Sequence, residues 1–306
     1  MLAFVLSGGG NRGALQVGAL QVLLESGIRP DMLVGTSVGA VNALFLACDP
    51  TPRGAYRLAE IWLQVRKNDV YPGTHLTALW SLVRRRESLF SNANWYRFLS
   101  RHLPAQRFGE LQVPAYAVAT DLETGQIRVF GDNPEEHLID GVMASTALPP
   151  LHPPWRVGGR RYIDGGAVAD LPVRVAIERG ADEIIALNLA NPLTPGEQLR
   201  TLVGIVHQAI GALIIRHIDA DLEYARLQNV KLRTIELRHQ LSLPPWDFSH
   251  SAQLIALGRE ITQAALEAEP MKALTWRDRL VARVTRASVP VLSVVQNVVG
   301  RRLETS

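Results

Sequence analysis

The sequence predicts an α/β protein whose central, mostly parallel sheet is covered by helices on both faces. Short, nearly continuous apolar runs alternate with longer helix-like runs along most of the chain. Strands that are apolar throughout are typical of parallel sheets buried on both faces. Glycine-rich turns also follow the first two apolar runs. With 306 residues, of which 47% are hydrophobic and 20% charged, the chain is long enough to bury a substantial core.

The individual elements follow from these patterns in chain order. Short apolar runs predict strands at 3–7, 32–35, 115–120, 126–130, 183–189 and 230–237. Helical runs lie between or after them, at 14–25, 38–47, 52–65, 171–179, 198–228 and 249–267. The polar segment 66–109, which contains Trp and Arg residues, predicts helices inserted above the sheet. The apolar stretch 202–215 is too short to span a bilayer, so we expect it to be a buried helix.

A change in composition near Glu269 and Pro270 predicts a main domain at 1–268 and a tail at 269–306. From Met271 onward the chain holds seven basic and two acidic residues, a charge of +5, whereas the whole chain carries +3. Apolar residues recur there at three- and four-residue spacing between arginines. Two interpretations stay open: a C-terminal helix pair packed on the body, or a basic amphipathic segment (271–306) lying on anionic membrane.

Cysteine content and the N-terminus bear on the compartment. Cys48 is the single cysteine, so no intramolecular disulfide is possible, and its apolar surroundings favour a buried hydrophobic role. The apolar run 2–6 is too short for a signal-peptide core. We expect a cytoplasmic protein, peripheral on the inner face of the membrane if the tail binds lipid. No His, Cys and Asp cluster has metal-ligand spacing, so we expect no metal or other cofactor, and nucleic acid is not an expected partner.

The first glycine-rich turn spans Gly8, Gly9, Gly10, Asn11, Arg12 and Gly13, between a predicted strand and a predicted helix. Such a turn offers free backbone N–H groups to an anion. Gly8, Gly10 and Gly13 also fit a dinucleotide-binding turn, which requires an acidic residue at the end of the second strand. Asp31 has roughly the right spacing, but it begins that strand. The turn alone therefore does not decide between the two uses.

The second turn, Gly35-Thr36-Ser37-Val38-Gly39, has the Gly-x-Ser-x-Gly pattern that exposes a serine hydroxyl at a sharp strand-to-helix turn. A serine there can also merely cap a helix. Small residues follow directly, which allows the helix to pack tightly under the turn. The positive end of the helix dipole favours a serine alkoxide. Ser37 is therefore the candidate nucleophile.

A serine nucleophile needs a base, and none of the eight histidines lies in a motif that marks it as catalytic. The stronger candidate is Asp164, which follows a short hydrophobic strand and precedes Gly165 and Gly166. Two glycines leave the carboxyl group with little steric cover, although Asp-Gly is also a common hairpin turn. A carboxylate is a poor base in water, so Asp164 must be desolvated and within hydrogen-bond reach of Ser37.

In this order, the two glycine motifs and the Asp-Gly-Gly motif resemble the patatin-like phospholipase family, in its bacterial branch. The segments 119–125 and 144–154 are also similar to the family, and the similarity covers roughly residues 1–190. The resemblance implies a three-layer fold and a catalytic dyad of Ser37 and Asp164 without histidine. It also implies an oxyanion hole formed by backbone N–H groups around Gly9, Gly10, Asn11 and Arg12. Two positions depart from the family pattern: Ser7 replaces an aspartate of the plant members, and His152 replaces a frequent aromatic side chain.

These features predict an enzyme that hydrolyses a lipid acyl ester, of phospholipase A or lysophospholipase type, through an acyl-enzyme intermediate. A thioesterase or neutral-lipid esterase with the same dyad is the first alternative. A nucleotide-binding regulatory protein that uses the Gly8–Gly13 turn is an alternative from another class, and an inactive relative serving as a membrane adaptor is a third. We expect Arg12 to stabilise the glycine turn or to contact a substrate phosphate.

Overall fold

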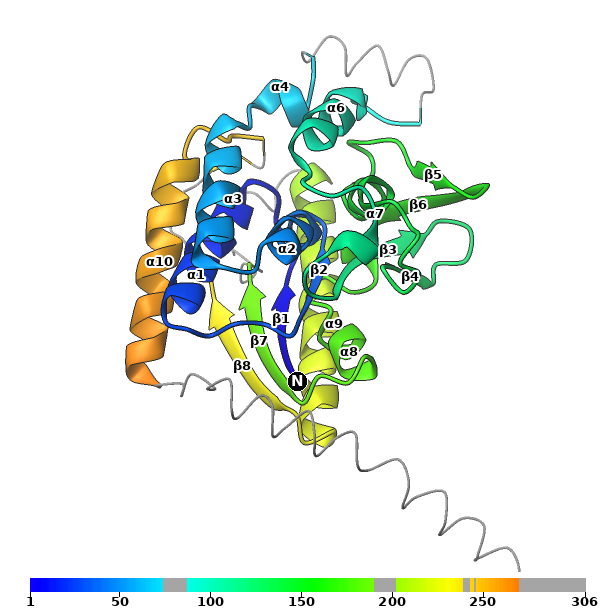
Figure 1. Ribbon diagram of the computed structural model, residues 1–306. Coiled ribbons are helices and arrows are strands. Elements are labelled where there is room, and N and C mark those ends of the chain that lie inside the picture. The colour runs from blue at the N-terminus through cyan, green and yellow to red at the C-terminus, as the bar shows by residue number, and fades with distance from the viewer. Residues whose placement is uncertain (74–86, 190–201, 239–242, 245, 270–306) are drawn as a thin grey trace, which may run out of the picture.

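The computed structural model describes residues 1–73, 87–189, 202–238, 243–244 and 246–269 (Figure 1). Within them, one sheet has the strand order β5-β6-β3-β2-β1-β7-β8, and β4 pairs with β3. The five strands β3, β2, β1, β7 and β8 are parallel, whereas β4, β5 and β6 add antiparallel pairs. The predicted α/β fold with a mostly parallel sheet is confirmed. The strands are β1 (Leu2–Leu6), β2 (Met32–Thr36), β3 (Ala115–Asp121), β4 (Ile127–Phe130), β5 (Trp155–Val157), β6 (Arg160–Asp164), β7 (Glu183–Asn188) and β8 (Lys231–Glu236).

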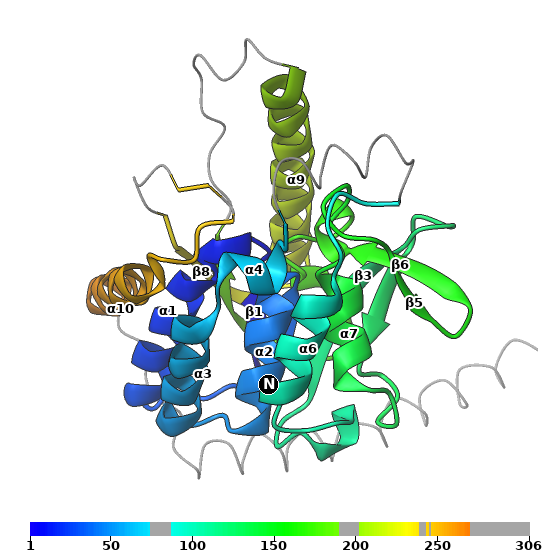
Figure 2. The ribbon, with the colours of Figure 1, turned by 90° about the horizontal axis from the view of Figure 1, so that it is seen from above.

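Helices cover both faces of the sheet (Figures 1 and 2). The central strands β1 and β2 are therefore buried along their whole length. In β1, Phe4 and Leu6 pack with the helices of one face, whereas Ala3 and Val5 pack with those of the other. All four side chains are fully buried. The first face carries α1 (Gly13–Glu25), α2 (Val38–Cys48), α3 (Pro52–Gln64), α7 (Leu138–Ser145) and α10 (Ser251–Ala268). The second carries α8 (Val173–Glu178) and α9 (Leu202–Leu227).

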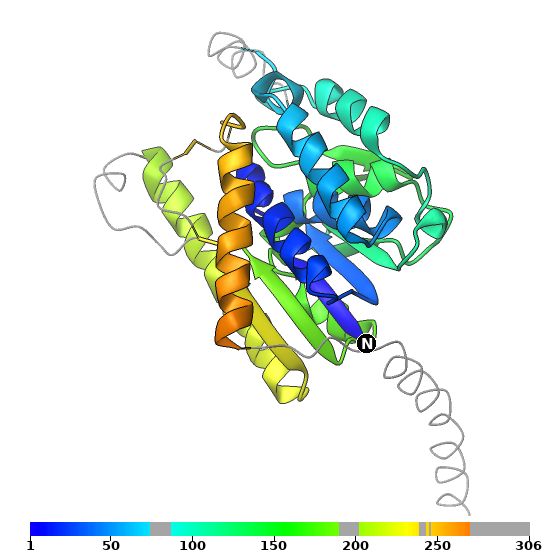
Figure 3. The ribbon, with the colours of Figure 1, turned by 60° about the vertical axis from the view of Figure 1, so that its left-hand side comes forward.

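Helices α1 and α10 lie side by side, although they come from opposite ends of the described chain (Figure 3). Two glycines allow their backbones to touch. A Cβ atom on Gly18 would lie 2.0 Å from the carbonyl oxygen of Ile255, and one on Gly258 would lie 2.0 Å from that of Leu15. Neither position has room for a methyl group. The segment after β8 is thereby attached closely to the first helix of the chain.

The prediction of a buried helix at 202–215 is correct about the helix and wrong about its burial. Ile205, Ile210 and Leu213 of α9 are 53%, 52% and 63% exposed. Among the described side chains of α9, only Ile218 and Ala225 are buried. The cause is geometric: the second half of α9 packs against α8 and β8, whereas its first half extends beyond the sheet (Figure 2). Among the described residues, no helix combines the length and apolarity needed to cross a bilayer.

The segment 66–109 supplies α4 (Lys67–Val70) and α6 (Ala93–His102), which lie beyond the carboxyl ends of the strands (Figure 1). Residues 74–86 within it lie outside the description. The same holds for 190–201, where the predicted helix 198–228 was expected to begin, and for 270–306. Both interpretations of the basic tail, and the domain boundary at 268, therefore stay predictions.

Candidate active site

The register of β3 brings two distant segments together at one edge of the sheet. Thr36, the last residue of β2, pairs with Val118, and Asp164, the last residue of β6, pairs with Ala119. Because β4 occupies the other edge of β3, strands β2 and β6 share one edge and approach each other from opposite directions. Their carboxyl ends therefore meet. Ser37, the residue after β2, lies opposite Asp164 although 127 positions separate them.

Ser37 has a backbone conformation that side chains rarely adopt, with φ 55° and ψ −125°. It precedes α2, and the turn is tight enough to require glycine on both sides. A Cβ atom on Gly35 would lie 2.3 Å from the carbonyl oxygen of Gly39, and one on Gly39 would lie 2.3 Å from that of Leu6. Hydrogen bonds hold this conformation. The N–H of Ser37 donates to Ser145 Oγ at 2.8 Å, and Ser145 Oγ donates to the carbonyl of Val118 at 2.5 Å.

The hydroxyl of Ser37 donates a hydrogen bond of 2.6 Å to Asp164 Oδ2. The other carboxyl oxygen of Asp164, Oδ1, accepts the N–H of Gly166 at 2.8 Å. Asp164 is only 4% exposed. Burial raises the pKa of Asp164 to about 6, and the hydrogen bonds from Ser37 and Gly166 partly oppose this rise. The pair thus combines a short hydrogen bond with a carboxylate that is more basic than one in water.

The glycine turn lies directly beside Ser37. A Cβ atom on Gly8 would be 3.3 Å from the Cβ of Ser37. After Gly9 the chain forms the 3₁₀ turn Gly10–Arg12, and the N–H groups of Gly9 and Gly10 come too early to have intrahelical partners. These N–H groups are the donors of the turn that an anion next to Ser37 could use.

Side chains of the turn anchor it to the body. Arg12 Nε donates to the carbonyl of Gly9 at 3.2 Å, and Arg12 Nη1 donates to that of Leu189 at 2.8 Å. Asn11 Nδ2 donates to the carbonyls of Pro244 and Asp247, at 2.9 and 2.7 Å. Both polar side chains therefore hold backbone carbonyls, which fixes the position of the turn relative to the end of β7 and the segment before α10.

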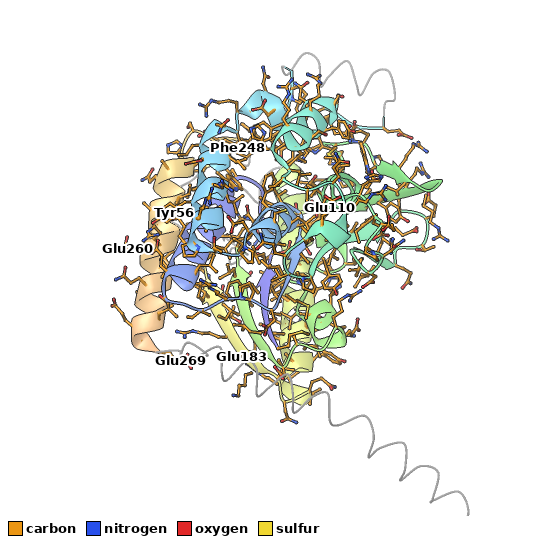
Figure 4. All side chains as sticks on the ribbon, viewed as in Figure 1. Tyr56, Glu110, Glu183, Phe248, Glu260 and Glu269 are labelled. Atoms are coloured by element: carbon orange, nitrogen blue, oxygen red, sulfur yellow. The ribbon has the colours of Figure 1, made fainter. Side chains whose placement is uncertain are left out.

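An aromatic cluster that sequence reasoning missed lies near Ser37 and Asp164. Tyr71 stacks on His152 with ring centroids 5.2 Å apart. The ring centroid of Phe248 lies 6.5 Å from that of Tyr71 and 6.3 Å from that of Trp62. Phe248 is labelled in Figure 4. Burial, and then the charge of Asp164, raises the pKa of Tyr71 to about 12. Burial also lowers the pKa of His152, whose Nε2 lies 2.7 Å from the carbonyl of Val70. The side chains of the cluster are therefore uncharged near neutral pH, and they lie beside the site.

Two further functional candidates carried little or no signal in the sequence. Ser145, which holds the N–H of Ser37, lies in the family-like segment 144–154, but nothing there marked its role. Asp170 is 9% exposed and faces Gly8 and Gly166, yet no motif surrounds it. Only the folded chain reveals both.

The site does not support the nucleotide-binding alternative. Asp31 Oδ2 accepts the N–H of Leu2 at 2.8 Å, at the amino end of β1. The turn Gly8–Gly13 follows the carboxyl end of the same strand. An acidic residue at the opposite end of the sheet cannot hold the ribose of a nucleotide whose phosphates occupy this turn. Among the described residues, no group of three or more His, Cys, Asp or Glu side chains is placed to hold a metal ion.

A serine raised at a strand-to-helix turn and hydrogen-bonded to a buried carboxyl group places the chain among α/β proteins with hydrolase-type sites. The family model described as patatin-like phospholipase matches residues 4–177, more than half of the chain. The chain belongs to the patatin-like phospholipase family. Membership of this family supports a lipid hydrolase function for the chain.

Relatives share the same region of the chain. "Patatin-like phospholipase domain-containing protein 7" of Rattus norvegicus is 30% identical over 191 residues, covering 62% of this chain and 14% of its own length. "Neuropathy target esterase sws" of Drosophila melanogaster is 26% identical over 191 residues, covering 62% of this chain and 13% of its own. The chain thus spans a small part of the length of these relatives.

Among solved structures, VipD from Legionella pneumophila is similar with a TM-score of 0.46 and 16% identity. That similarity covers 87% of this chain and 66% of VipD. ExoU from Pseudomonas aeruginosa, solved with SpcU, has a TM-score of 0.41 and 16% identity, covering 87% of this chain and 53% of the matched chain.

Proposed function

We propose that this protein hydrolyses acyl esters of phospholipids or lysophospholipids, with Ser37 as nucleophile and Asp164 as base. The observation that carries the proposal is the 2.6 Å hydrogen bond from Ser37 Oγ to the buried Asp164 carboxyl group. Family membership supports the lipid class of substrate. The aromatic cluster of Trp62, Tyr71, His152 and Phe248 supports an apolar environment for an acyl chain.

The reaction requires two balanced acyl transfers. Ser37 Oγ attacks the ester carbonyl carbon while its proton passes to Asp164 Oδ2. The tetrahedral intermediate then expels the alcohol, which takes that proton, and leaves an acyl group on Ser37. Water attacks the acyl-enzyme with Asp164 again accepting the proton, and Ser37 leaves as an alkoxide that the proton restores. Each good donor to the oxyanion contributes about 3 kcal/mol to such reactions. Of the donors that the sequence predicts, around Gly9, Gly10, Asn11 and Arg12, we assign this role to the N–H groups of Gly9 and Gly10. The N–H of Arg12 donates to the carbonyl of Gly9 at 3.3 Å instead.

Two features of the site match this sequence of steps. The backbone conformation of Ser37 places the hydroxyl at the amino end of α2, where the helix dipole favours an alkoxide. Burial makes Asp164 a better proton acceptor at neutral pH than an ordinary carboxylate, and its two hydrogen-bond donors fix its orientation.

The test combines labelling with turnover on the full chain. A fluorophosphonate probe should label wild-type protein and the exposed-serine control Ser26→Ala, but not Ser37→Ala. Hydrolysis of p-nitrophenyl butyrate should fall by a factor of roughly 10³ or more in Ser37→Ala and Asp164→Asn, with circular dichroism unchanged. Activity within tenfold of wild type in either variant would contradict the proposed dyad.

A substrate panel decides the finer class. We expect release of fatty acid from phospholipid or lysophospholipid vesicles to exceed hydrolysis of triacylglycerol and acyl-CoA. A preference for acyl-CoA or triacylglycerol would instead favour a thioesterase or a neutral-lipid esterase with the same dyad.

A further inference from the structure

A second buried carboxyl group, which the proposed reaction does not use, belongs to the same site. A Cβ atom on Gly8 would lie 2.5 Å from Asp170 Oδ1 and 3.3 Å from the Cβ of Ser37. A Cβ atom on Gly166 would lie 3.2 Å from Asp164 Oδ1 and 3.2 Å from Asp170 Oδ1. The two carboxyl groups therefore flank Gly166, and Asp170 lies between the glycine turn and the dyad.

The carboxyl groups of Asp164 and Asp170 differ in the hydrogen-bond donors that surround them. Asp164 accepts one hydrogen bond on each oxygen, from Ser37 Oγ and from the N–H of Gly166. Asp170, by contrast, has one backbone donor beside its carboxyl group, the N–H of Gly8. That N–H also donates to the backbone carbonyl of Asp170 at 3.1 Å. A carboxylate is stabilised by N–H and O–H donors, whereas a protonated carboxyl group needs fewer of them. The geometry favours a charge on Asp164 over a charge on Asp170.

The charged groups that act on Asp170 are Asp164 and Arg12. Burial and the negative charge of Asp164 raise the pKa of Asp170 to about 7, while Arg12 and the N–H of Gly8 lower it. The guanidinium of Arg12 is directed to the carbonyls of Gly9 and Leu189 rather than to this carboxyl group. Since like charges at short range resist joint ionisation, the pair holds one proton near neutral pH.

We propose that Asp170 is a positioning residue that works in its protonated, neutral form, so that Asp164 alone carries the negative charge when Ser37 reacts. The proposal rests on the function proposed above. An ionised Asp170 would put a second negative charge beside the glycine turn, where the oxyanion develops, and would oppose the transition state. A neutral Asp170 supports the turn without this penalty.

The proposal predicts a bell-shaped profile for kcat/KM against pH. The rising limb follows ionisation of Asp164, and the falling limb follows loss of the proton from Asp170. Asp170→Asn replaces the neutral acid with a neutral group of the same shape. It should therefore retain kcat/KM within about threefold at pH 7, keep the rising limb and lose the falling limb.

The experiment measures p-nitrophenyl butyrate hydrolysis from pH 5 to pH 9 for wild type, Asp170→Asn and Asp221→Asn, with circular dichroism at each pH. Asp221 is a matched control: burial also raises its pKa, but it lies on α9 and pairs with Arg174 at 3.4 Å. Between pH 7 and pH 9 we expect wild type and Asp221→Asn to lose roughly 50-fold in kcat/KM, and Asp170→Asn to change by less than about twofold.

Each other result refutes the inference in a recognisable way. A falling limb that survives in Asp170→Asn belongs to another group, and a wild-type profile without one shows that ionisation of Asp170 is harmless. A loss of more than about tenfold at every pH in folded Asp170→Asn means that the charged form is required. If wild type is neither labelled by fluorophosphonate nor active on any ester, the proposed function itself fails, whereas the preceding results overturn only the role of Asp170.

Discussion

Asp164→Asn should make the protein more stable at neutral pH while abolishing its activity. A buried carboxyl group prefers its neutral form, and burial raises the pKa of Asp164 from 3.8 to about 6. The folded state therefore binds this proton more tightly than the unfolded chain does between these two values. Stability that wild type has below pH 4 is consequently lost as the pH rises through about 6.

The magnitude follows from the size of the pKa difference. A rise of about two pH units corresponds to roughly 3 kcal/mol, at 1.4 kcal/mol for each unit. The free energy of unfolding of Asp164→Asn, minus that of wild type, should thus increase by about this amount between pH 4 and pH 8. The change also removes the charge that raises the pKa of Asp170, which acts in the same direction.

Urea unfolding followed by circular dichroism, at half-unit steps from pH 4 to pH 8, measures this difference. Glu25→Gln is a control of opposite sign, because hydrogen bonding from Arg259 lowers the pKa of Glu25 and makes its charge stabilising above pH 4.5. The free energy of unfolding of Glu25→Gln, minus that of wild type, should become more negative as the pH rises. A constant difference for Asp164→Asn, within about 0.5 kcal/mol, would refute the argument that burial makes Asp164 basic.

Three further predictions concern stability and membrane contact. Thr262→Val should raise the free energy of unfolding by about 1 kcal/mol in urea melts, because Thr262 Oγ1 is buried without a hydrogen-bond partner among the described residues; a destabilised variant would contradict this. Gly258→Ala should lower it by roughly 3 kcal/mol or more, since its methyl group would overlap the carbonyl of Leu15; a change below about 1 kcal/mol would show that α1 and α10 can separate. Deleting 271–306 should weaken sedimentation with anionic vesicles more than it slows p-nitrophenyl butyrate hydrolysis; unchanged sedimentation would return the basic tail to a packing role.

Local patterns in the sequence were sufficient for most of the elements and for the two motifs of the site, but they did not predict β5 or α7. Strand β1 and helix α1 lie within one residue of their predicted bounds, because an apolar run closed by glycines specifies both locally. The Gly-x-Ser-x-Gly pattern located the turn at Ser37, since only glycine fits at Gly35 and Gly39. The failure at 202–215 shows the limit of such patterns. An apolar helix has the same sequence pattern whether it packs on a sheet or extends past the edge of the sheet, as the first half of α9 does.

The sequence by itself determined the candidates for the reacting pair, a serine on a tight turn and a carboxylate followed by glycines. Only the tertiary structure decided that they meet, because the register of β3 sets the ends of β2 and β6 against each other. It also decided that Asp164 is buried with two hydrogen-bond donors to its carboxyl group, whereas Asp170 is buried beside the N–H of Gly8 and the charge of Asp164. Burial and hydrogen bonding depend on neighbours from distant segments, so no local pattern distinguishes Asp164 from Asp170 in this respect.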